Sequence, residues 1–290
     1  SAISSWSGVL ASQFRWHSLC SPVAGNFNGT GENEYVLGRQ RAQGVINSIN
    51  LLARENDGTS FWLTVWGEDE SVSSTPSLAD VDNDGDLEVI AVSDYMSSPA
   101  DNTYGTVYCL DASTGTEEWS TYVGGMLVFG GIATGNLDSD SSLEIVVGAT
   151  SGSNSIKVLD GSTGAIQYSI ATNGGVYAGA SIADLDGDGD NDIVVSSSGG
   201  MLYCWDGPTG NSLSGFPVDL DTWTDDGVSI GDIDGDGMLE LVLAGKDGKL
   251  HAINHDGSST GGFPITVSTS NALSGQPALG DIDDDGRLEI

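Results

Sequence analysis

The chain has 290 residues, with 42 acidic against 8 basic side chains, which gives a formal charge of −34. Such a surface repels nucleic-acid phosphates and anionic lipid headgroups, so we expect neither nucleic-acid binding nor direct membrane insertion. Hydrophobic residues make up 38% of the chain, too many for a disordered acidic tail, and no apolar run approaches the ~18 residues that cross a bilayer.

A nine-residue acidic pattern recurs along the chain, beginning at residues 26, 80, 136, 184, 232 and 281. It has acid or Asn at positions 1, 3 and 5, usually Gly at position 6, and acid at position 9. The sharpest copies are Asp80–Glu88, Asp184–Asp192, Asp232–Glu240 and Asp281–Glu289. The copies at Asn26–Glu34 and Asn136–Glu144 are degraded. A repeat of this length organises the whole fold.

Each acidic segment lies between two predicted strands. A run of small residues precedes it, in chain order SPVAGN, TPSLAD, GGIATGN, GASIAD, GVSIGD and QPALGD. A β-branched run follows, as in EVIAV, EIVVG and DIVVS, and then a third run ending in turn residues, as in GTVYCLDASTG. A fourth run completes the unit. Residues 45–55 alone have a helical pattern, but their place in the repeat predicts a third strand.

Four short strands in each unit of ~50 residues are typical of a β-propeller. Neighbouring sheets of a propeller cover each other's faces, which explains strands that are apolar on both sides. We therefore predict an all-β fold with a single propeller domain over residues 1–290, supplying about six four-stranded blades. We expect the last blade to be cut off at Ile290, residues 1–18 to resemble outer strands of a preceding blade, and a complete seven-bladed ring to need roughly 350 residues.

The acidic segments predict cation sites. Two carboxylates ~4 Å apart repel by about 4 kcal/mol at an effective dielectric of ~20, so a bare acidic surface does not explain the recurrence. Oxygen ligands at alternate positions of a turning chain suit Ca²⁺ better than Mg²⁺, and no His or Cys lies in any segment to favour Zn²⁺. An EF-hand is excluded because it needs its acid at position 12 and flanking helices.

The pattern D-x-D-x-D-G-x-x-[DE] between two strands resembles the FG-GAP (VCBS-like) repeats of the integrin α-subunit propeller and its bacterial relatives. Phe129–Ala133 is close to the motif that names the family, and Gly215–Pro217 and Gly262–Pro264 resemble the GFP turns of bacterial members. The resemblance covers residues ~19–290. It implies a seven-bladed propeller with Ca²⁺ in the loop joining two strands of a blade, held by side chains at positions 1, 3, 5 and 9 and a carbonyl at position 7.

Carried over position by position, the resemblance implies four sets of metal ligands in the sharp copies. It implies two further sets in the degraded copies. The sharp sets are Asp80, Asp82, Asp84, Asp86 and Glu88; Asp184, Asp186, Asp188, Asp190 and Asp192; Asp232, Asp234, Asp236, Met238 and Glu240; and Asp281, Asp283, Asp285, Arg287 and Glu289. The degraded sets are Asn136, Asp138, Asp140, Ser142 and Glu144, and Asn26, Asn28, Thr30 and Glu34. Because Ser141 replaces Gly, we expect weaker binding or a replaced turn in the third segment.

Three cysteines, Cys20, Cys109 and Cys204, form no disulfide framework. Cys109 and Cys204 occupy the same position in strands two blades apart, too far for a disulfide. We expect all three to be small buried hydrophobic residues.

The first functional hypothesis is a secreted or cell-surface calcium-binding propeller that acts without catalysis in adhesion, recognition or extracellular assembly. Its partner would be an extracellular protein or glycan, a further copy of itself, or neighbouring domains of a longer chain. The alternatives are a polysaccharide lyase-type enzyme, for which we assign no catalytic residue, and a glycan-binding lectin. A lectin would use exposed aromatic residues from the set Trp62, Trp66, Trp119, Trp205 and Trp223.

Overall fold

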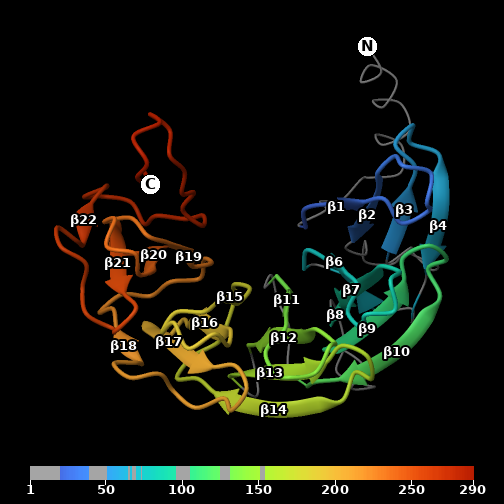
Figure 1. Ribbon diagram of the computed structural model, residues 1–290, viewed down its shortest axis with the longest axis horizontal. Helices are drawn as coiled ribbons and strands as arrows, with labels where there is room; N and C mark the ends of the chain where they lie inside the picture. Colours follow the sequence, from blue (N-terminus) through green and yellow to red (C-terminus); the bar gives the residue numbers. More distant parts are fainter. Residues whose placement is uncertain are drawn as a thin grey trace.

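The computed structural model describes residues 20–38, 51–64, 66, 70–72, 74–95, 105–124, 131–150 and 154–290. These residues form strands and turns and contain no helix, and hence none with the length to cross a membrane. Figure 1 shows the strands gathered into sheets that follow one another around an open ring, with β1, β6, β11, β15 and β19 on its inner side. The described part of the chain is thus an all-β propeller, as predicted.

Five antiparallel sheets of four strands each form the blades. The first contains β1 (Val23–Gly25), β2 (Glu34–Gly38), β3 (Leu51–Arg54) and β4 (Ser60–Thr64). The second contains β6 (Ser77–Ala79), β7 (Glu88–Val92), β9 (Thr106–Asp111) and β10 (Glu117–Tyr122). The third contains β11 (Ala133–Gly135), β12 (Glu144–Ala149), β13 (Ser155–Asp160) and β14 (Ile166–Ala171).

The fourth sheet contains β15 (Ser181–Ala183), β16 (Asp192–Ser196), β17 (Met201–Asp206) and β18 (Val218–Asp219). The fifth contains β19 (Ser229–Gly231), β20 (Glu240–Ala244), β21 (Lys249–Asn254) and β22 (Ile265–Thr266). A small pair, β5 (Glu70–Ser71) with β8 (Asp94–Tyr95), stands apart from the blades. In the sixth unit, a single bridge joins Gly280 to Glu289.

The hydrophobic core lies between adjacent blades. Every residue of β7, β16 and β20 is buried, so these second strands have no solvent face. Between the second and third sheets, Ile90 and Val107 belong to one buried cluster with Ile145 and Leu159. This packing explains the β-branched runs without polar alternation, because each face of a blade is covered by its neighbour.

An aromatic residue on the outer strand of three blades hydrogen-bonds to the next blade. The indole N–H of Trp62 donates to the carbonyl of Ala112 at 2.7 Å, and that of Trp119 donates to Gly161 at 2.8 Å. The hydroxyl of Tyr168 donates to the carbonyl of Gly207 in the same way. We call this contact the aromatic latch. Each latch ring covers the glycine of the STG-type turn that follows, so a Cβ on Gly115 would lie 2.6 Å from Trp62.

The structure decides several local expectations. Residues 51–54 of the ambiguous segment form β3, so the strand interpretation is confirmed there, whereas residues 45–50 lie outside the described residues. Residues 1–18 and the Phe129–Gly130 pair of the name-giving motif also lie outside them. All three cysteines are buried and free, as expected. The two GFP turns are present, each with a cis peptide bond before its proline.

Candidate metal centres

Each acidic segment joins the first and second strands of a blade, as the spacing predicts, and its position-9 acid fastens the loop. In all six copies, this carboxylate accepts a hydrogen bond from the backbone N–H of position 2, at 2.6 to 3.1 Å. The donors are Phe27, Val81, Leu137, Leu185, Ile233 and Ile282. Since each bond uses a single carboxylate oxygen, the other oxygen remains for a ligand.

Hydrogen bonds within the loop orient the remaining acids. In the second loop, Asp82 accepts from the N–H of Asp84 at 3.1 Å, and Asp84 accepts from Asp86 at 2.9 Å. The N–H of Gly85, a residue with φ +100°, donates to Asp80 at 3.1 Å. Equivalent bonds recur in the fourth and fifth loops. The backbone therefore holds the carboxylates in place rather than leaving them to diverge.

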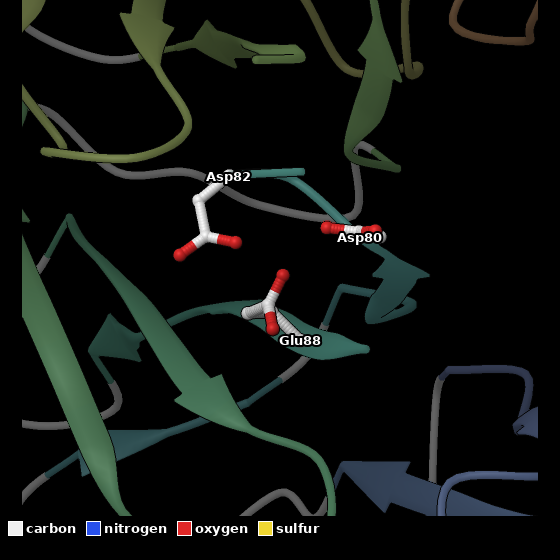
Figure 2. Close-up of side chains that lie close together, drawn as sticks. All are labelled: Asp80, Asp82 and Glu88. Atoms are coloured by element: carbon white, nitrogen blue, oxygen red, sulfur yellow. The ribbon is translucent and has the colours of Figure 1, made fainter. Parts of the chain in front are cut away.

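The loops bring carboxylates from positions 1, 3 and 9 together. Asp80, Asp82 and Glu88 each offer an oxygen within 4.8 Å of the others, and Figure 2 shows their side chains around one space beside β7. The same grouping holds for Asp184, Asp186 and Asp192 and for Asp232, Asp234 and Glu240. The position-5 acids of these loops, Asp84, Asp188 and Asp236, lie outside the groups, although the sequence placed them in the ligand sets.

The sixth and third loops group different positions. Asp281, Asp283 and Asp285 come together in the sixth loop, and Glu289, which accepts the N–H of Ile282 as its counterparts do in the other loops, lies outside that group. Asp138, Asp140 and Glu144 come together in the third. The carbonyl ligands assigned to position 7 stay a prediction; these residues are Asp86, Ser142, Asp190, Met238 and Arg287.

Burial and mutual repulsion disfavour the charged form of the position-9 acids. Burial first, and then the charges of Asp82 and Glu118, raise the pKa of Glu88 to about 8 against the opposing hydrogen bond from Val81. Burial likewise raises the pKa of Asp192 to about 6. The pKa values of Glu144 and Glu240 are also raised, first by burial. A bound cation would remove this conflict by neutralising the charges.

The third loop has a replaced turn, as expected. In the other loops, positions 4 and 6 both have positive φ, for example Asn83 at 61° with Gly85 at 100°. Ser139 and Ser141 do not adopt such angles. Instead, the amide of Asn136 donates to the carbonyl of Asp140 at 3.1 Å. The loop follows a different path because serine avoids the left-handed region.

Sequence spacing missed two polar side chains that approach the loops from other strands. Gln167 on β14 donates to Asp138 at 3.1 Å and to Glu144 at 3.5 Å. Glu118 on β10 has the equivalent place beside the second loop, where it accepts from the thiol of Cys109 at 3.6 Å. A signal for both residues was present in the sequence, because Glu118 and Gln167 occupy the same position of the repeat, each just before the aromatic residue of a latch.

The first loop also gains an acid from elsewhere. Glu34 is fully buried, and its Oε1 has no hydrogen-bond partner. Glu55 follows β3 directly; Arg54 pairs with Tyr35, which places Glu55 opposite Glu34. The amide of Asn28 donates to Glu55 at 3.0 Å, and desolvation followed by the charge of Glu34 raises the pKa of Glu55. An unpartnered buried carboxylate oxygen beside a second carboxylate fits a cation.

Comparison with known families decides what these loops belong to. The FG-GAP-like repeat family matches residues 136–195, 184–243 and 232–290, which together span more than half of the chain. The chain belongs to the FG-GAP-like repeat family. Each matched FG-GAP-like segment begins at one acidic loop and ends just after the next acidic loop, so the metal candidates are part of the repeat itself.

Solved structures support the propeller fold of this FG-GAP-like chain. The V. cholerae biofilm matrix protein Bap1 is 17% identical with a TM-score of 0.58, over 87% of this chain and 40% of Bap1. BamB from Moraxella catarrhalis is 15% identical with a TM-score of 0.50, over 88% of this chain and 78% of BamB. BBS1N, solved in complex with ARL6DN, is 13% identical with a TM-score of 0.55, over 84% of this chain and 66% of BBS1N. A search of curated protein sequences found no match.

The residues of the FG-GAP-like loops fit a hard cation. Every grouped donor is a carboxylate oxygen, and no His or Cys takes part in the groups. The repeated grouping, the raised pKa values and the unpartnered oxygen of Glu34 all favour a positive charge at these places. Several loops of the protein can therefore hold a metal ion.

Proposed function

We propose that this FG-GAP-like propeller is a calcium-binding, non-enzymatic protein that acts outside the cell or at its surface, in adhesion, recognition or assembly. The recurrence of carboxylate groups in successive loops carries the proposal. Ca²⁺ takes six to eight oxygen ligands in flexible geometry, whereas Mg²⁺ demands a near-ideal octahedron. An irregular set of ligands from positions 1, 3 and 9, completed by carbonyl groups and water, suits Ca²⁺.

In this proposal the ions stabilise contacts between blades. The N–H of Leu143, in the third loop, donates to the carbonyl of Val81, in the second, at 2.9 Å. The amide of Asn191, in the fourth loop, donates to the carbonyl of Asn136 at 2.9 Å. An ion that fixes one loop therefore fixes the surface against which the next loop packs.

The extracellular setting has two supports. Sites of modest affinity are filled where free Ca²⁺ reaches about 10⁻⁴–10⁻³ M, as outside cells. One protein of similar fold, Bap1, is a biofilm matrix protein. The partner would be an extracellular protein or glycan, a second copy of the chain, or neighbouring domains.

The enzymatic alternative is a polysaccharide lyase. It has a direct test, because lysis of an acidic polysaccharide yields an unsaturated product that absorbs ultraviolet light. Under the non-enzymatic proposal, incubation with pectin, alginate or sulfated glycans in Ca²⁺ gives no such absorbance. Its appearance would replace the proposal with the lyase.

Removal of Ca²⁺ tests the central claim. An ion that binds only the folded state at 100 times its dissociation constant stabilises by about 2.7 kcal/mol per site. Each kcal/mol shifts Tm by roughly 2–4 °C for a domain of this size. We expect excess chelator to lower Tm by about 5 °C or more, and Ca²⁺ but not an equal concentration of Mg²⁺ to restore it. An identical melting curve with and without chelator would remove the metal proposal.

A further inference from the structure

A pocket lies at the end of the blades opposite to the acidic loops. It is lined by the segments that lead into the innermost strands: Gly131 before β11, Tyr177–Ser181 at β15, and Asp225–Gly227 before β19. The acidic loops leave these same strands at their other ends. Since three successive blades and the following segment at Gln276 meet here, the pocket faces the inner side of the ring.

The pocket is large enough for a small organic ligand. Its volume is about 560 Å³, within the range of roughly 300–1,000 Å³ that is usual for such sites. One wall of the pocket carries a network of polar side chains. Lys246, whose side chain is 17% exposed, forms ion pairs with Asp225 and Asp226 there.

Lys246 fixes that wall through four neighbours. Its ammonium donates to the hydroxyl of Ser274 at 2.9 Å and to the carbonyl of Leu273 at 3.1 Å, in addition to the two carboxylates. Burial lowers the pKa of Lys246, but Asp225 and Asp226 outweigh it and raise the pKa overall. The group stays charged, so the two carboxylates are held in one geometry before any ligand arrives.

The charge of the pocket selects its ligand. Two carboxylates against one ammonium leave a net negative site on a chain of charge −34, which repels anions. Binding of a free metal cation is also disfavoured, because Lys246 already neutralises the two carboxylates in part. The remaining polar groups include Tyr177, Ser181 and Gln276, whose oxygens can act as acceptors. The hydroxyl of Ser181 and one amide N–H of Gln276 already donate to the carbonyl of Val228, so Gln276 keeps its second N–H as a donor. A neutral molecule with many hydroxyl groups needs both kinds of partner.

We propose that this pocket binds a neutral oligosaccharide. The proposal rests on the recognition role proposed above and names its ligand class and site. Trp223 is not one of the lining residues, but it lies two residues before Asp225, it is 51% exposed, and its backbone carbonyl accepts the backbone N–H of Lys246 at 3.0 Å. An exposed indole presents an apolar face on which the C–H face of a sugar ring stacks.

The test uses the full chain in Ca²⁺ and a panel of immobilised oligosaccharides. Neutral probes are hexamers of cellulose, chitin, mannan and laminarin, and acidic probes are oligomers of alginate, polygalacturonate and heparin. We expect binding to at least one neutral probe and none to the acidic ones. By calorimetry with the bound neutral hexamer, Asp226→Asn, Gln276→Ala and Trp223→Ala each weaken affinity at least tenfold.

Tyr122→Ala is the matched control, because Tyr122 is also 51% exposed but lies on the outer strand β10. Its affinity equals that of the wild type under the proposal. Binding of acidic probes alone, binding of no neutral probe, or unchanged affinity in all three pocket variants would overturn the proposal. Gln276 is exposed, so we expect Gln276→Ala to fold. This variant therefore still tests the proposal if Asp226→Asn fails to fold.

The two proposals fail in different ways. If chelator leaves Tm unchanged while the hexamer still binds, the calcium proposal is overturned and the pocket proposal stands. If Tm depends on Ca²⁺ but no neutral probe binds, the pocket proposal alone is overturned.

Discussion

At the scale of single residues, the position-9 acid combines two tasks. It accepts the N–H of position 2 in every loop, and in four loops it also joins a carboxylate group. The first task stabilises the loop without a metal. The second destabilises the loop when the metal is missing, because a buried carboxylate such as Glu88 then lies close to other acids.

Glu55 supplies the missing charge of the first loop, which leads to a prediction. Glu55→Gln removes a carboxylate opposite the unpartnered Oε1 of Glu34, so the loop loses an ion ligand of full charge. We expect the variant to bind one Ca²⁺ fewer than the wild type in equilibrium dialysis at about 1 mM free Ca²⁺. Asp57→Asn, in the same turn but bonded to the N–H of Thr59, is the control and keeps the full number. Equal numbers in all three proteins would show that the first loop holds no ion through Glu55.

The third loop yields a second prediction. Ser139→Gly combined with Ser141→Gly gives both positions the freedom for positive φ that the other loops use. Each non-glycine residue in that region costs of order 1 kcal/mol, so we expect Ca²⁺ affinity at this loop to rise about tenfold. Calorimetric titration measures the change, and Ser142→Gly, at the next position, gives none. No gain in the double variant would mean that the serines are not what distorts the loop.

The spacing of the acids was enough to predict the groups at positions 1, 3 and 9, because these positions are close along one turning loop. It could not predict Gln167, which is 29 residues from Asp138 and meets it only when β14 folds beside the loop. The position-5 acids remain a prediction in three loops. Asp84 accepts the N–H of Asp86 there, as Asp285 accepts that of Arg287 in the sixth loop, where the position-5 acid does join the group.

At the scale of the elements, the aromatic latches explain the STG-type turns. The sequence identified these turns as hairpins but gave no reason for their fixed glycine, since the ring that covers it comes from the preceding blade. Trp62 and Trp119 bond to backbone carbonyls between blades, and Trp205 is 3% exposed. Trp223 remains the exposed member of the aromatic set that the sequence offered for glycan contact.

Gly164 provides the test of a latch. It has φ +69°, and a Cβ there would lie 2.4 Å from the ring of Trp119. Gly164→Ala therefore adds both backbone strain and overlap, and we expect a loss of about 2 kcal/mol or more in the free energy of unfolding. Urea denaturation in saturating Ca²⁺ measures it. Gly261→Ala, at a glycine with open space around it, should change the free energy by less than about 1 kcal/mol; equal losses would refute the latch.

The outer strands of the last two complete blades are shorter than those of the two preceding blades. β18 and β22 contain two residues each, where β10 and β14 contain six. In both blades the chain leaves the sheet after a single bridge, Trp205 to Ser212 or Ile253 to Ser259, and passes through a GFP turn. The turns were recognised from the sequence, but their interruption of the strand depends on sheet geometry.

At the scale of the whole molecule, the raised pKa values predict opposite pH dependences with and without Ca²⁺. Glu88 has a folded pKa of about 8 against an ordinary value of 4.5, and Asp192 one of about 6 against 3.8. Protonation of these groups favours the folded state, so their contribution is complete below pH ~4 and is lost as the pH rises to 8. In chelator, Tm should fall from pH 5 to pH 8.

With saturating Ca²⁺ the sign reverses, because the ion binds the deprotonated carboxylates. The difference in Tm between the Ca²⁺-loaded and chelated protein should therefore widen steadily from pH 5 to pH 8. About 0.5 M NaCl in all samples screens the general repulsion of the acidic surface and isolates the loop carboxylates. A chelated protein that melts higher at pH 8 than at pH 5 would contradict the assignment of these buried acids.

The aromatic latches also give the ring a polarity. Each donor lies in one blade and its acceptor in the blade that follows along the chain, as Trp119 bonds to Gly161. In the three blades that have a latch, a chain that emerges from the ribosome N-terminus first thus exposes an unpaired indole or phenol donor on the outer strand until the next blade is made. These latches therefore close in chain order, each one only after the following blade has folded.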